Sequence, residues 1–398
     1  MIMSTVASHQ TLTPAQRRRA TLDRKGYTES RRLATAAPNK IFYGLLAVIS
    51  MLIVFGLIMV LSSSSIVAIN TGGSPWNMFR RQFAWATFGL FALLATYRMP
   101  YHHWHRFSKY VLWAAFGLMA LPFVGGVGVT INGARAWAQL GAIRFQPSEI
   151  LKVAVLLYCA SLLGRRRSEV DNVHRTFKPI MYVWGAAVFG SLMQKDFGAA
   201  VVFTAIILST LFIAGIPLRL IATVSIFSLA GSLLLIASST RMQNRLLAFL
   251  DLEGSKENHG YQIWQSVLSI ANGGVTGVGP GEGTGKWGYV PLAHSDFIFA
   301  IIAEEFGLIG ALAVLGGFMW LLYLGIQAAL GARDPFGAVL AGGITVWLCV
   351  QATINIGGVI GAMPVTGLTL PLISYGGSSL FMTMAAVGLL LNVARNMK

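Results

Sequence analysis

Long apolar runs, separated by short polar segments, set the pattern of this sequence. They fall at roughly 41–69, 80–97, 107–128, 147–163, 179–194, 197–214, 217–238, 297–329, 336–359 and 370–393. A helix needs about 20 residues to cross the hydrocarbon core of a bilayer, and it satisfies its own backbone hydrogen bonds there. The pattern therefore predicts an all-α integral membrane protein with about ten transmembrane helices.

Two polar segments stand out between these runs. Residues 1–40 are basic and rich in Ser, Thr and Ala, which predicts a disordered tail that lies against anionic lipid headgroups. A signal peptide is not expected, because no short apolar region with a cleavage site follows. Residues 239–296 form the largest hydrophilic loop, between the seventh and eighth runs. The predicted organisation is thus a tail over 1–40 and a membrane domain over 41–398.

Composition and charge refine this prediction. Of the 398 residues, 55% are hydrophobic and 11% are charged, whereas soluble domains carry about 25% charged residues. The net charge of +16 could suggest a nucleic-acid partner, but the positions of the basic residues argue against one. Most of them fall in alternate segments that begin with the N-terminus, as in cytoplasmic loops. We therefore expect both termini in the cytoplasm and the 239–296 loop outside.

Ionisable residues gather where this outer loop meets the eighth apolar run. His294 and Asp296 stand at the border, and Glu304 and Glu305 follow within the run. Carboxylates at a boundary between water and lipid are energetically costly and mark function by default. A helix N-cap formed by Ser295 or Asp296 is the structural alternative, and it is compatible with a functional role.

A second polar group precedes and enters the fourth run. Arg135, Trp137 and Arg144 suit an anionic, lipid-linked substrate, although anchoring to ordinary headgroups explains them almost as well. Glu149 and Lys152 are three residues apart and share one helix face. We expect them to form a structural ion pair, because an unpaired charge is penalised there.

The glycine-rich segment 273–288 tests a nucleotide-binding interpretation. Pro280 and Trp287 stand where a Walker A loop requires Gly and then Ser or Thr, and no βαβ unit surrounds the dinucleotide-like spacing at 283–288. A flexible or closely packed loop is the better interpretation. Lys286 within it could meet a phosphate.

Three further segments leave their alternatives open. Asp196, in the turn 194–198, fits either a site role or simple solvation. Residues 355–358 and 364–379 are rich in Gly, Pro and hydroxyl side chains and cannot form one unbroken helix. Irregular backbone lining a cavity and close packing through small residues are equally good explanations for them.

Together these segments resemble the SEDS family (shape, elongation, division and sporulation), the polytopic peptidoglycan glycosyltransferases. The resemblance covers roughly residues 41–396 and is carried by residues 144–152, Gly260-Tyr261-Gln262 with Gln265-Ser266, His294 to Phe299 with Glu304-Glu305, and Gly367 to Ser379. Lys286-Trp287 and the 194–198 turn look closer to the FtsW branch than to the RodA branch.

This resemblance implies a ten-helix enzyme of the bacterial cytoplasmic membrane that polymerises lipid II on the outer face, in cell division. The family's essential acid matches Asp296, which we expect to be the catalytic base. The expected substrate-binding residues are Arg135, Trp137, Arg144, Lys286 and His294. The expected supporting residues are Gln146, Glu149, Lys152, Asp196, Glu304, Glu305, Ser374, Gly376 and Gly377.

The resemblance also implies partners and marks three departures, one of them Lys195, which stands where the family's Pro-Asp-x-Gly turn has Pro. The implied partners are lipid II and undecaprenyl-linked glycan, a class B penicillin-binding protein, and divisome or elongasome membrane proteins. No nucleotide cofactor is required, and Mg²⁺ or Mn²⁺ could assist the leaving diphosphate. Leu292 and Ala136 stand where the family usually has Glu and Arg. Asp296 therefore has fewer carboxylate neighbours, and the role of Arg135 is open.

Three other functions fit parts of the pattern. A role in elongation, as in the RodA branch, uses the same chemistry. A lipid II flippase or transporter could use Glu149, Lys152, Glu304 and Glu305 to line a translocation path. A non-catalytic scaffold for cell-wall enzymes would need none of these acids.

Overall fold

The computed structural model describes residues 39–70, 73–131, 133–141, 143–169 and 172–397, so the predicted basic tail lies outside the described part. Within it, twelve α-helices form the protein. They are α2 (Lys40–Asn70), α3 (Asn77–Arg98), α4 (Tyr101–Leu118), α5 (Pro147–Arg165), α6 (Lys178–Met193), α7 (Phe197–Ile213), α8 (Leu218–Ser238), α9 (Thr240–Leu250), α10 (Tyr261–Gly273), α11 (Ile298–Leu330), α12 (Pro335–Val359) and α13 (Gly377–Arg395). Short helical turns complete them: η1 (Leu121–Phe123), η2 (Arg167–Glu169), η3 (Val173–Phe177) and η4 (Gly285–Trp287).

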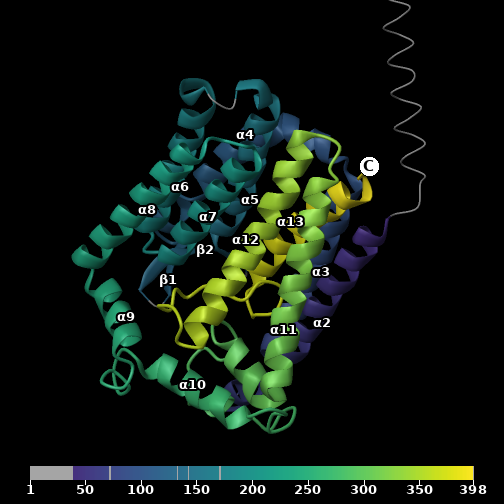
Figure 1. The fold of residues 1–398 in the computed structure, drawn as a ribbon. Coiled ribbons are helices and arrows are strands. Elements are labelled where there is room, and N and C mark those ends of the chain that lie inside the picture. The colour runs from purple at the N-terminus through teal and green to yellow at the C-terminus, as the bar shows by residue number, and fades with distance from the viewer. Residues whose placement is uncertain (1–38, 71–72, 132, 142, 170–171, 398) are drawn as a thin grey trace, which may run out of the picture. The chain divides into compact units, whose positions relative to one another are not determined.

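Each of the ten predicted apolar runs coincides with one of these helices (Figure 1). Three boundaries were wrong. The predicted run 107–128 begins too late, because the first turn of α4 carries polar residues such as His102 and His103 that conceal the helix. The same run ends too late, because α4 ends at Leu118 and the apolar residues after it are not α-helical. The predicted run 370–393 begins too early, because its first residues are apolar but not helical. Helices α9 and α10, inside the hydrophilic loop, were not predicted.

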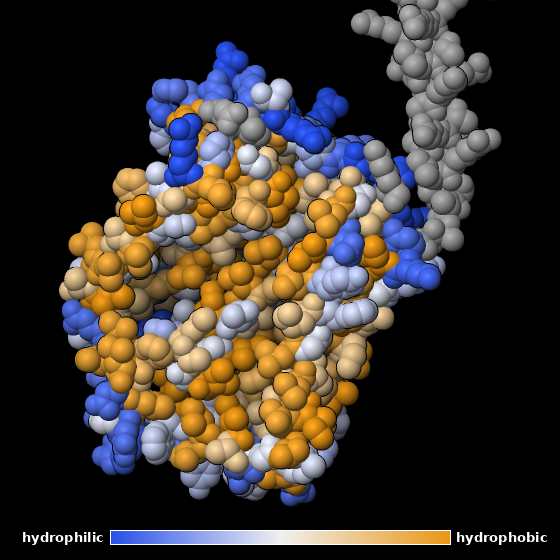
Figure 2. Space-filling view, in the orientation of Figure 1, coloured by the Kyte–Doolittle hydropathy of each residue, from blue (hydrophilic) through white to orange (hydrophobic). Residues whose placement is uncertain are grey.

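Six helices are long and apolar enough to cross a membrane by length and composition: α2, α5, α8, α11, α12 and α13. The chain is therefore a multi-pass membrane protein, and ten crossings remain a prediction. Figure 2 shows one face on which hydrophobic residues gather over the helices while hydrophilic residues collect toward the two ends. This distribution is what an apolar bilayer between two aqueous phases requires.

The helices confirm the all-α membrane fold, and a small antiparallel sheet that was not predicted adds to it. Strands β1 (Gly128–Ile131), β2 (Ala134–Leu140) and β3 (Ile143–Phe145) pair in that order. In β2 the side chains of Ala136 and Ala138 are buried, whereas the intervening Trp137 is only half-buried, the alternation expected of a strand with one covered face. Strands this short leave too few residues for that alternation to be recognised within an otherwise apolar sequence.

Helix α11 contains a break that anchors the outer loop. Gly307 has φ 63° and ψ −159°, a conformation that favours glycine and interrupts the helical hydrogen bonds. The carbonyl groups released beside the break accept hydrogen bonds from the loop: Val278 N–H donates to Glu304 O (3.0 Å) and Gly279 N–H to Glu305 O (3.1 Å). The glycine-rich segment is therefore closely packed, one of the two alternatives predicted for it.

The C-terminal helix α13 packs along α3 at very short range. A Cβ atom on Gly388 would lie 2.0 Å from Thr96 Oγ1 and 2.4 Å from Leu93 O. One turn later, the buried Asn392 side chain donates hydrogen bonds to the carbonyl groups of Thr96 (3.1 Å) and Met99 (2.6 Å). Small residues at such contacts let two membrane helices approach closely.

We predict that Gly388→Ala lowers stability, because the added methyl group must push α3 and α13 apart. Overpacking of this kind costs about 1–3 kcal/mol. The measurement is the thermal unfolding midpoint of the purified protein in detergent. Gly231→Ala is the matched control, since a Cβ on Gly231 in α8 meets nothing within 4 Å. Equal midpoints for the two variants would contradict the packing described here.

Candidate functional site

A cavity of about 1780 Å³ opens in the described part of the chain. Its wall is formed by the small sheet, the N-terminal turns of α5 and α7, helix α9, the turn 291–297 and the segments 365–369 and 375–379. Figure 2 shows the surface hollowed near the place that β1 and β2 occupy in Figure 1, with hydrophilic residues inside. Elements far apart in the sequence thus meet around one water-accessible space.

A tight turn before α11 brings Asp296 to this wall. Leu292 has φ 57°, an uncommon value for a residue with a side chain, and its carbonyl oxygen accepts hydrogen bonds from Ser295 N (3.0 Å) and Phe297 N (3.4 Å). Strained backbone of this kind is often found at functional sites. Phe297 is the N-cap of α11 and, within the described residues, no side chain caps it. The alternative interpretation of Ser295 or Asp296 as an N-cap was therefore wrong.

The Asp296 carboxylate faces a guanidinium group from α9. Arg245 Nη1 donates to Thr366 O (3.2 Å), which fixes the arginine beside the next residue, Gly367. A Cβ on Gly367 would lie 3.7 Å from Asp296 Oδ2 and 3.8 Å from Arg245 Nη2, so both side chains lie beside this glycine, near each other but without a direct ion pair. Burial raises the pKa of Asp296 to about 7, while Arg245 and a hydrogen bond from Ser295 oppose that rise. Asp296 therefore exchanges its proton near neutral pH.

A second arginine lies one turn earlier on α9. Arg241 also lines the cavity, and its Nη1 is buried with no hydrogen-bond partner among the described residues. Burial lowers the pKa of Arg245, and the charge of Arg241 lowers it further, whereas Asp296 and Asp196 raise it. The pair forms a cationic face that was not predicted. The available signal was two arginines four residues apart in an amphipathic stretch, which places them on one helix face.

His294 lies on the same wall as Asp296. Its ring stands edge-on to Tyr375, with the centroids 5.5 Å apart, and its carbonyl oxygen accepts from Tyr375 N (2.9 Å). Burial lowers the pKa of His294, which favours the neutral ring. Ser374 Oγ donates to Ser295 O (2.6 Å). These contacts tie the segment after α12 to the turn that carries Asp296.

Helix α3 holds the other side of that segment. Gln82 Nε2 donates to Ser374 O (3.1 Å), and Gln82 Oε1 accepts from Gly376 N (3.3 Å). A Cβ on Gly377 would lie 2.3 Å from the indole nitrogen of Trp85, so only glycine permits this approach. The structure therefore brings Ser374, Gly376 and Gly377 to the cavity as parts of its frame.

Asp196 has structural partners rather than free solvation. It caps α7 by accepting from Ala199 N (3.0 Å), and its other oxygen accepts from Gln146 Nε2 (2.6 Å) and Ser148 Oγ (3.2 Å). Three donors leave this carboxylate little capacity for a ligand. It joins the beginnings of α5 and α7 at the cavity wall.

The predicted ion pair between Glu149 and Lys152 is present, at 2.8 Å. Lys152 Nζ also donates to Gln351 Oε1 (3.2 Å) and lies 5.3 Å from the ring centroid of Trp347. Both members of the pair line the cavity, yet each is almost fully buried. The pair gives the charges partners inside the helix bundle, as a buried charge requires.

The predicted cations separate into two groups. Arg144 and Trp137 line the cavity from the sheet, and Arg144 Nη2 donates to Gln139 Oε1 (3.0 Å). Arg135 does not line it. Its guanidinium group turns instead to η1, where Arg135 Nε donates to Pro122 O (2.8 Å). This contact holds the sheet against η1, and substrate binding by Arg135 stays a prediction.

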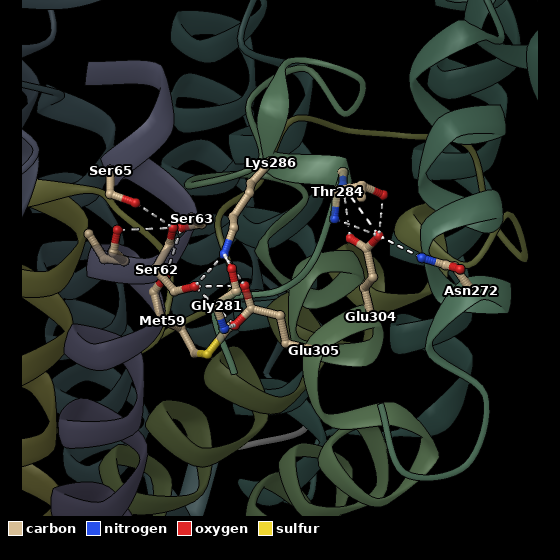
Figure 3. A network of polar contacts seen from close by, with 12 residues as sticks. Met59, Ser62, Ser63, Ser65, Asn272, Gly281, Thr284, Lys286, Glu304 and Glu305 are labelled. Carbon is tan, nitrogen blue, oxygen red and sulfur yellow. Dashed lines mark hydrogen bonds and ion pairs between the residues drawn. The ribbon is translucent and has the colours of Figure 1, made fainter. Parts of the chain in front are cut away.

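Lys286 is likewise not part of the cavity wall. It is 2% exposed and forms an ion pair with Glu305 at 2.7 Å (Figure 3). Lys286 Nζ also donates to Gly281 O (2.6 Å), and Glu305 accepts from Ser62 Oγ of α2 (2.6 Å). The prediction that Lys286 meets a phosphate is corrected, because its charge is already neutralised inside the protein.

Glu304 satisfies the neighbouring part of the loop. Its carboxylate accepts from Thr284 N (3.0 Å), Gly285 N (3.0 Å) and Asn272 Nδ2 (3.1 Å), as Figure 3 shows. Together with Glu305, it fastens the outer loop to α11, from which the Asp296 turn departs. Both glutamates therefore act as supports, and neither reaches the cavity.

The described residues form no recognisable metal-binding site. Among the described residues, no three His, Cys, Asp or Glu side chains gather as they would around a metal ion. The acids beside Asp296 are already engaged by protein donors. The residues present therefore do not fit a resident divalent cation, and no step is assigned to one.

Sequence comparison identifies relatives along almost the whole chain. Residues 43–398 match the FtsW/RodA/SpoVE family, described as cell cycle proteins. A protein of Mycobacterium tuberculosis is 37% identical over 359 residues, which are 90% of this chain and 68% of the relative. One of Thioalkalivibrio sulfidiphilus is 41% identical over 358 residues, which are 88% of this chain and 89% of the relative. Both are called probable peptidoglycan glycosyltransferase FtsW.

Solved structures share the fold as well. A chain reported under "Structural coordination of polymerization and crosslinking by a peptidoglycan synthase complex" is 30% identical, with a TM-score of 0.72 over 90% of this chain and 98% of that one. The crystal structure of the Thermus thermophilus rod shape determining protein RodA is 28% identical, with a TM-score of 0.67 over 92% of this chain and 99% of that one.

We predict that Lys286→Met destabilises the protein, because it leaves Glu305 buried without its cation. Breaking a buried ion pair from one side costs about 3–5 kcal/mol, whereas replacing both partners with apolar residues is often nearly neutral. The double variant Lys286→Met/Glu305→Leu should therefore recover most of the lost thermal stability. Lys109→Met, at an exposed position on α4, is the control. A single variant as stable as this control would contradict the buried pair.

Proposed function

Because the chain belongs to the SEDS family, the FtsW/RodA/SpoVE group of cell cycle proteins, we propose that it polymerises lipid II into glycan strands during cell division. The observation that carries this proposal is the Asp296 carboxylate, half-buried in the wall of a large cavity beside the cationic face of α9. Named relatives support the reaction, since those at 37% and 41% identity are called probable peptidoglycan glycosyltransferases.

The chemistry requires a base, because a sugar hydroxyl is a poor nucleophile. Asp296 takes the proton from the acceptor hydroxyl as its oxygen bonds to the anomeric carbon of the donor. The bond from that carbon to the diphosphate oxygen breaks, and the electron pair leaves with the diphosphate lipid. A single displacement with one base inverts the anomeric centre. A pKa of about 7 keeps enough Asp296 ionised at neutral pH while preserving its basicity.

The departing diphosphate needs positive charge. Arg245 and Arg241 supply it from α9, and Arg144 supplies it from the sheet. Arg241 carries the strongest indication, since its buried Nη1 lacks an acceptor among the described residues and a phosphate oxygen would provide one. Preorganised cations of this kind stabilise charge that develops in the transition state.

The apolar part of the cavity suits the lipid carried by the donor. Trp85 and Phe88 of α3 and Phe381 of α13 also line the cavity. A polyprenyl chain can lie against these aromatic side chains while the diphosphate remains at the cationic face. The cavity therefore combines the two kinds of surface that a lipid diphosphate requires.

The proposed topology has about ten crossings, with both termini in the cytoplasm and the cavity on the outer face. The beginning of α2 and the end of α13 lie at the same end of the helices in Figure 1, as an even number of crossings requires. The excess of basic residues in alternate segments supports this orientation. The active side is then extracellular or periplasmic.

A class B penicillin-binding protein is the proposed partner, together with other membrane proteins of the division machinery. The relative with a TM-score of 0.72 comes from a peptidoglycan synthase complex that couples polymerization and crosslinking. A glycan strand made here would need such crosslinking. The division role is supported by the FtsW names of the relatives.

We predict that Asp296→Asn abolishes polymerisation, because the amide cannot accept the proton. Purified protein supplied with lipid II should form glycan strands only when Asp296 is present. Glu257→Gln, an exposed acid-to-amide change in the same outer loop, is the matched control and should retain activity. Wild-type-like polymer from Asp296→Asn would remove Asp296 from the mechanism. Transport of labelled lipid II between leaflets without any glycan would instead indicate a flippase.

We predict that Arg241→Gln weakens donor binding, because a charge-assisted contact to the diphosphate is lost. The KM for lipid II should rise by about 10-fold, the equivalent of about 1.4 kcal/mol, with a smaller change in kcat. Arg219→Gln, an exposed change at the opposite end of the α8–α9 arm, provides the control. An unchanged KM would exclude Arg241 from the donor site.

A further inference from the structure

A buried amide on α12 touches the backbone of Asp296 without lining the large cavity. Asn355 Nδ2 donates to Asp296 O (2.7 Å) and to Leu368 O (2.7 Å). Both partners are carbonyl oxygens, so the amide must present its NH₂ group to them. Residues 355–358 lie in α12 and are helical, so the irregular connection predicted from their glycines was wrong. The Asn355 side chain of this helix bridges two segments of the site.

The bridge closes a circuit of contacts around the reacting carboxylate. Leu368 belongs to the segment whose Thr366 carbonyl oxygen accepts from Arg245 Nη1 (3.2 Å). Arg245 and Asp296 in turn both lie beside Gly367, in the middle of that segment. Residues 366–368 therefore link the two groups. Asn355 holds this segment at Leu368, Arg245 binds it at Thr366, and the segment thereby sets the position of the arginine relative to the carboxylate.

The geometry points to Asn355 as a positioning residue, whose amide sets the separation between the Asp296 carboxylate and the Arg245 guanidinium. This inference rests on the proposed function of Asp296 as the base. Asn355 does not touch the substrate space, so it acts only through the backbone of Asp296 and of residues 366–368.

Little free space lies between Asn355 and Asp296, so the hydrogen bonds of Asn355 can fix the position of Asp296. A void of about 10 Å³ lies between Asp296, Asn355 and Gly367. A space of this size holds at most one water molecule. Asn355 itself is buried, and packed side chains transmit a change at such a position to their neighbours.

The charged groups around Asp296 determine how its pKa changes when the hydrogen bonds of Asn355 are lost. Arg245 and Arg241 approach from α9, His294 lies in the same turn with its neutral form favoured, and Asp196 acts on Arg245 from the start of α7. Of these, Arg245 opposes the rise in the pKa of Asp296. Greater separation therefore leaves the carboxylate more basic, and the base becomes active only at higher pH.

The test is Asn355→Leu, with polymerisation of lipid II measured from about pH 5 to about pH 9. This range brackets the pKa of Asp296, about 7. The rate at neutral pH should fall by about 10- to 100-fold, the effect of misplacing a catalytic group by about 1 Å. The KM for lipid II should change little. The rising limb of the pH profile should move upward by about one unit, as expected when an opposite charge within about 4–6 Å is drawn away.

A matched control separates positioning from stability. Asn392 is also a buried amide that donates to backbone carbonyl groups, but it joins α13 to α3 away from the cavity. Asn392→Leu should lower the thermal unfolding midpoint and leave the pH profile in place. If Asn355→Leu shifts only the unfolding midpoint, as the control does, the positioning role is overturned.

A double variant tests the route through Arg245. Arg245→Gln alone should also move the pH profile upward, and adding Asn355→Leu should move it no further, because coupled residues are not additive. Additive shifts would contradict the proposed circuit. Should Asn355→Leu fail to fold, Asn355→Ser removes the same bridge with a smaller side chain and is read by the same criteria. Failure of the proposed function has a different signature, namely polymer formation by Asp296→Asn.

Discussion

The site depends on the closeness of a half-buried carboxylate and a half-buried guanidinium beside a residue without a side chain. Asp296 and Arg245 come from segments that are distant in the sequence, and Gly367 gives both of them room. Burial alone would favour the protonated acid, and the arginine counteracts it. The balance leaves a base whose pKa is about 7, at the wall of a large cavity.

Most of the surrounding polar contacts keep these two groups in place. Ser374 and Gln82 hold the segment after α12, and the Lys286–Glu305 pair fastens the outer loop to α11. The break at Gly307 provides the backbone groups to which that loop binds. A turn at the end of a long loop would otherwise be mobile, and a misplaced base loses much of its rate advantage. The buried charges are therefore part of the preorganisation of the site, even though they do not touch it.

The membrane helices were predictable because each one is long and apolar, a signal that one sequence carries directly. The motifs around Asp296 and the Glu149–Lys152 pair were equally accessible, because their spacing is local. The cationic face of α9 was not predicted, since hydropathy marks 239–296 only as polar and does not reveal that Arg241 and Arg245 fold back over the cavity. The prediction that Lys286 meets a phosphate was wrong because the sequence shows its charge but not the partner of that charge. Its partner Glu305 is 19 residues away in the sequence, and only the folded loop shows that the two charges cancel.

The four acids of this region differ in how their hydrogen-bonding capacity is used, and this difference separates support from chemistry. Glu304 accepts from four donors of the outer loop, and Glu305 pairs with a buried lysine. Asp196 caps α7 while it holds two side chains at the beginning of α5. Each carboxylate has its acceptor sites filled by the protein, so ionisation is stabilised and further ligands are excluded. Asp296 has Ser295 and the charge of Arg245 as its partners among the described residues, and it opens onto the cavity. A carboxylate with unused acceptor capacity, a pKa near neutrality and access to a substrate-sized space is the one able to accept a proton during reaction.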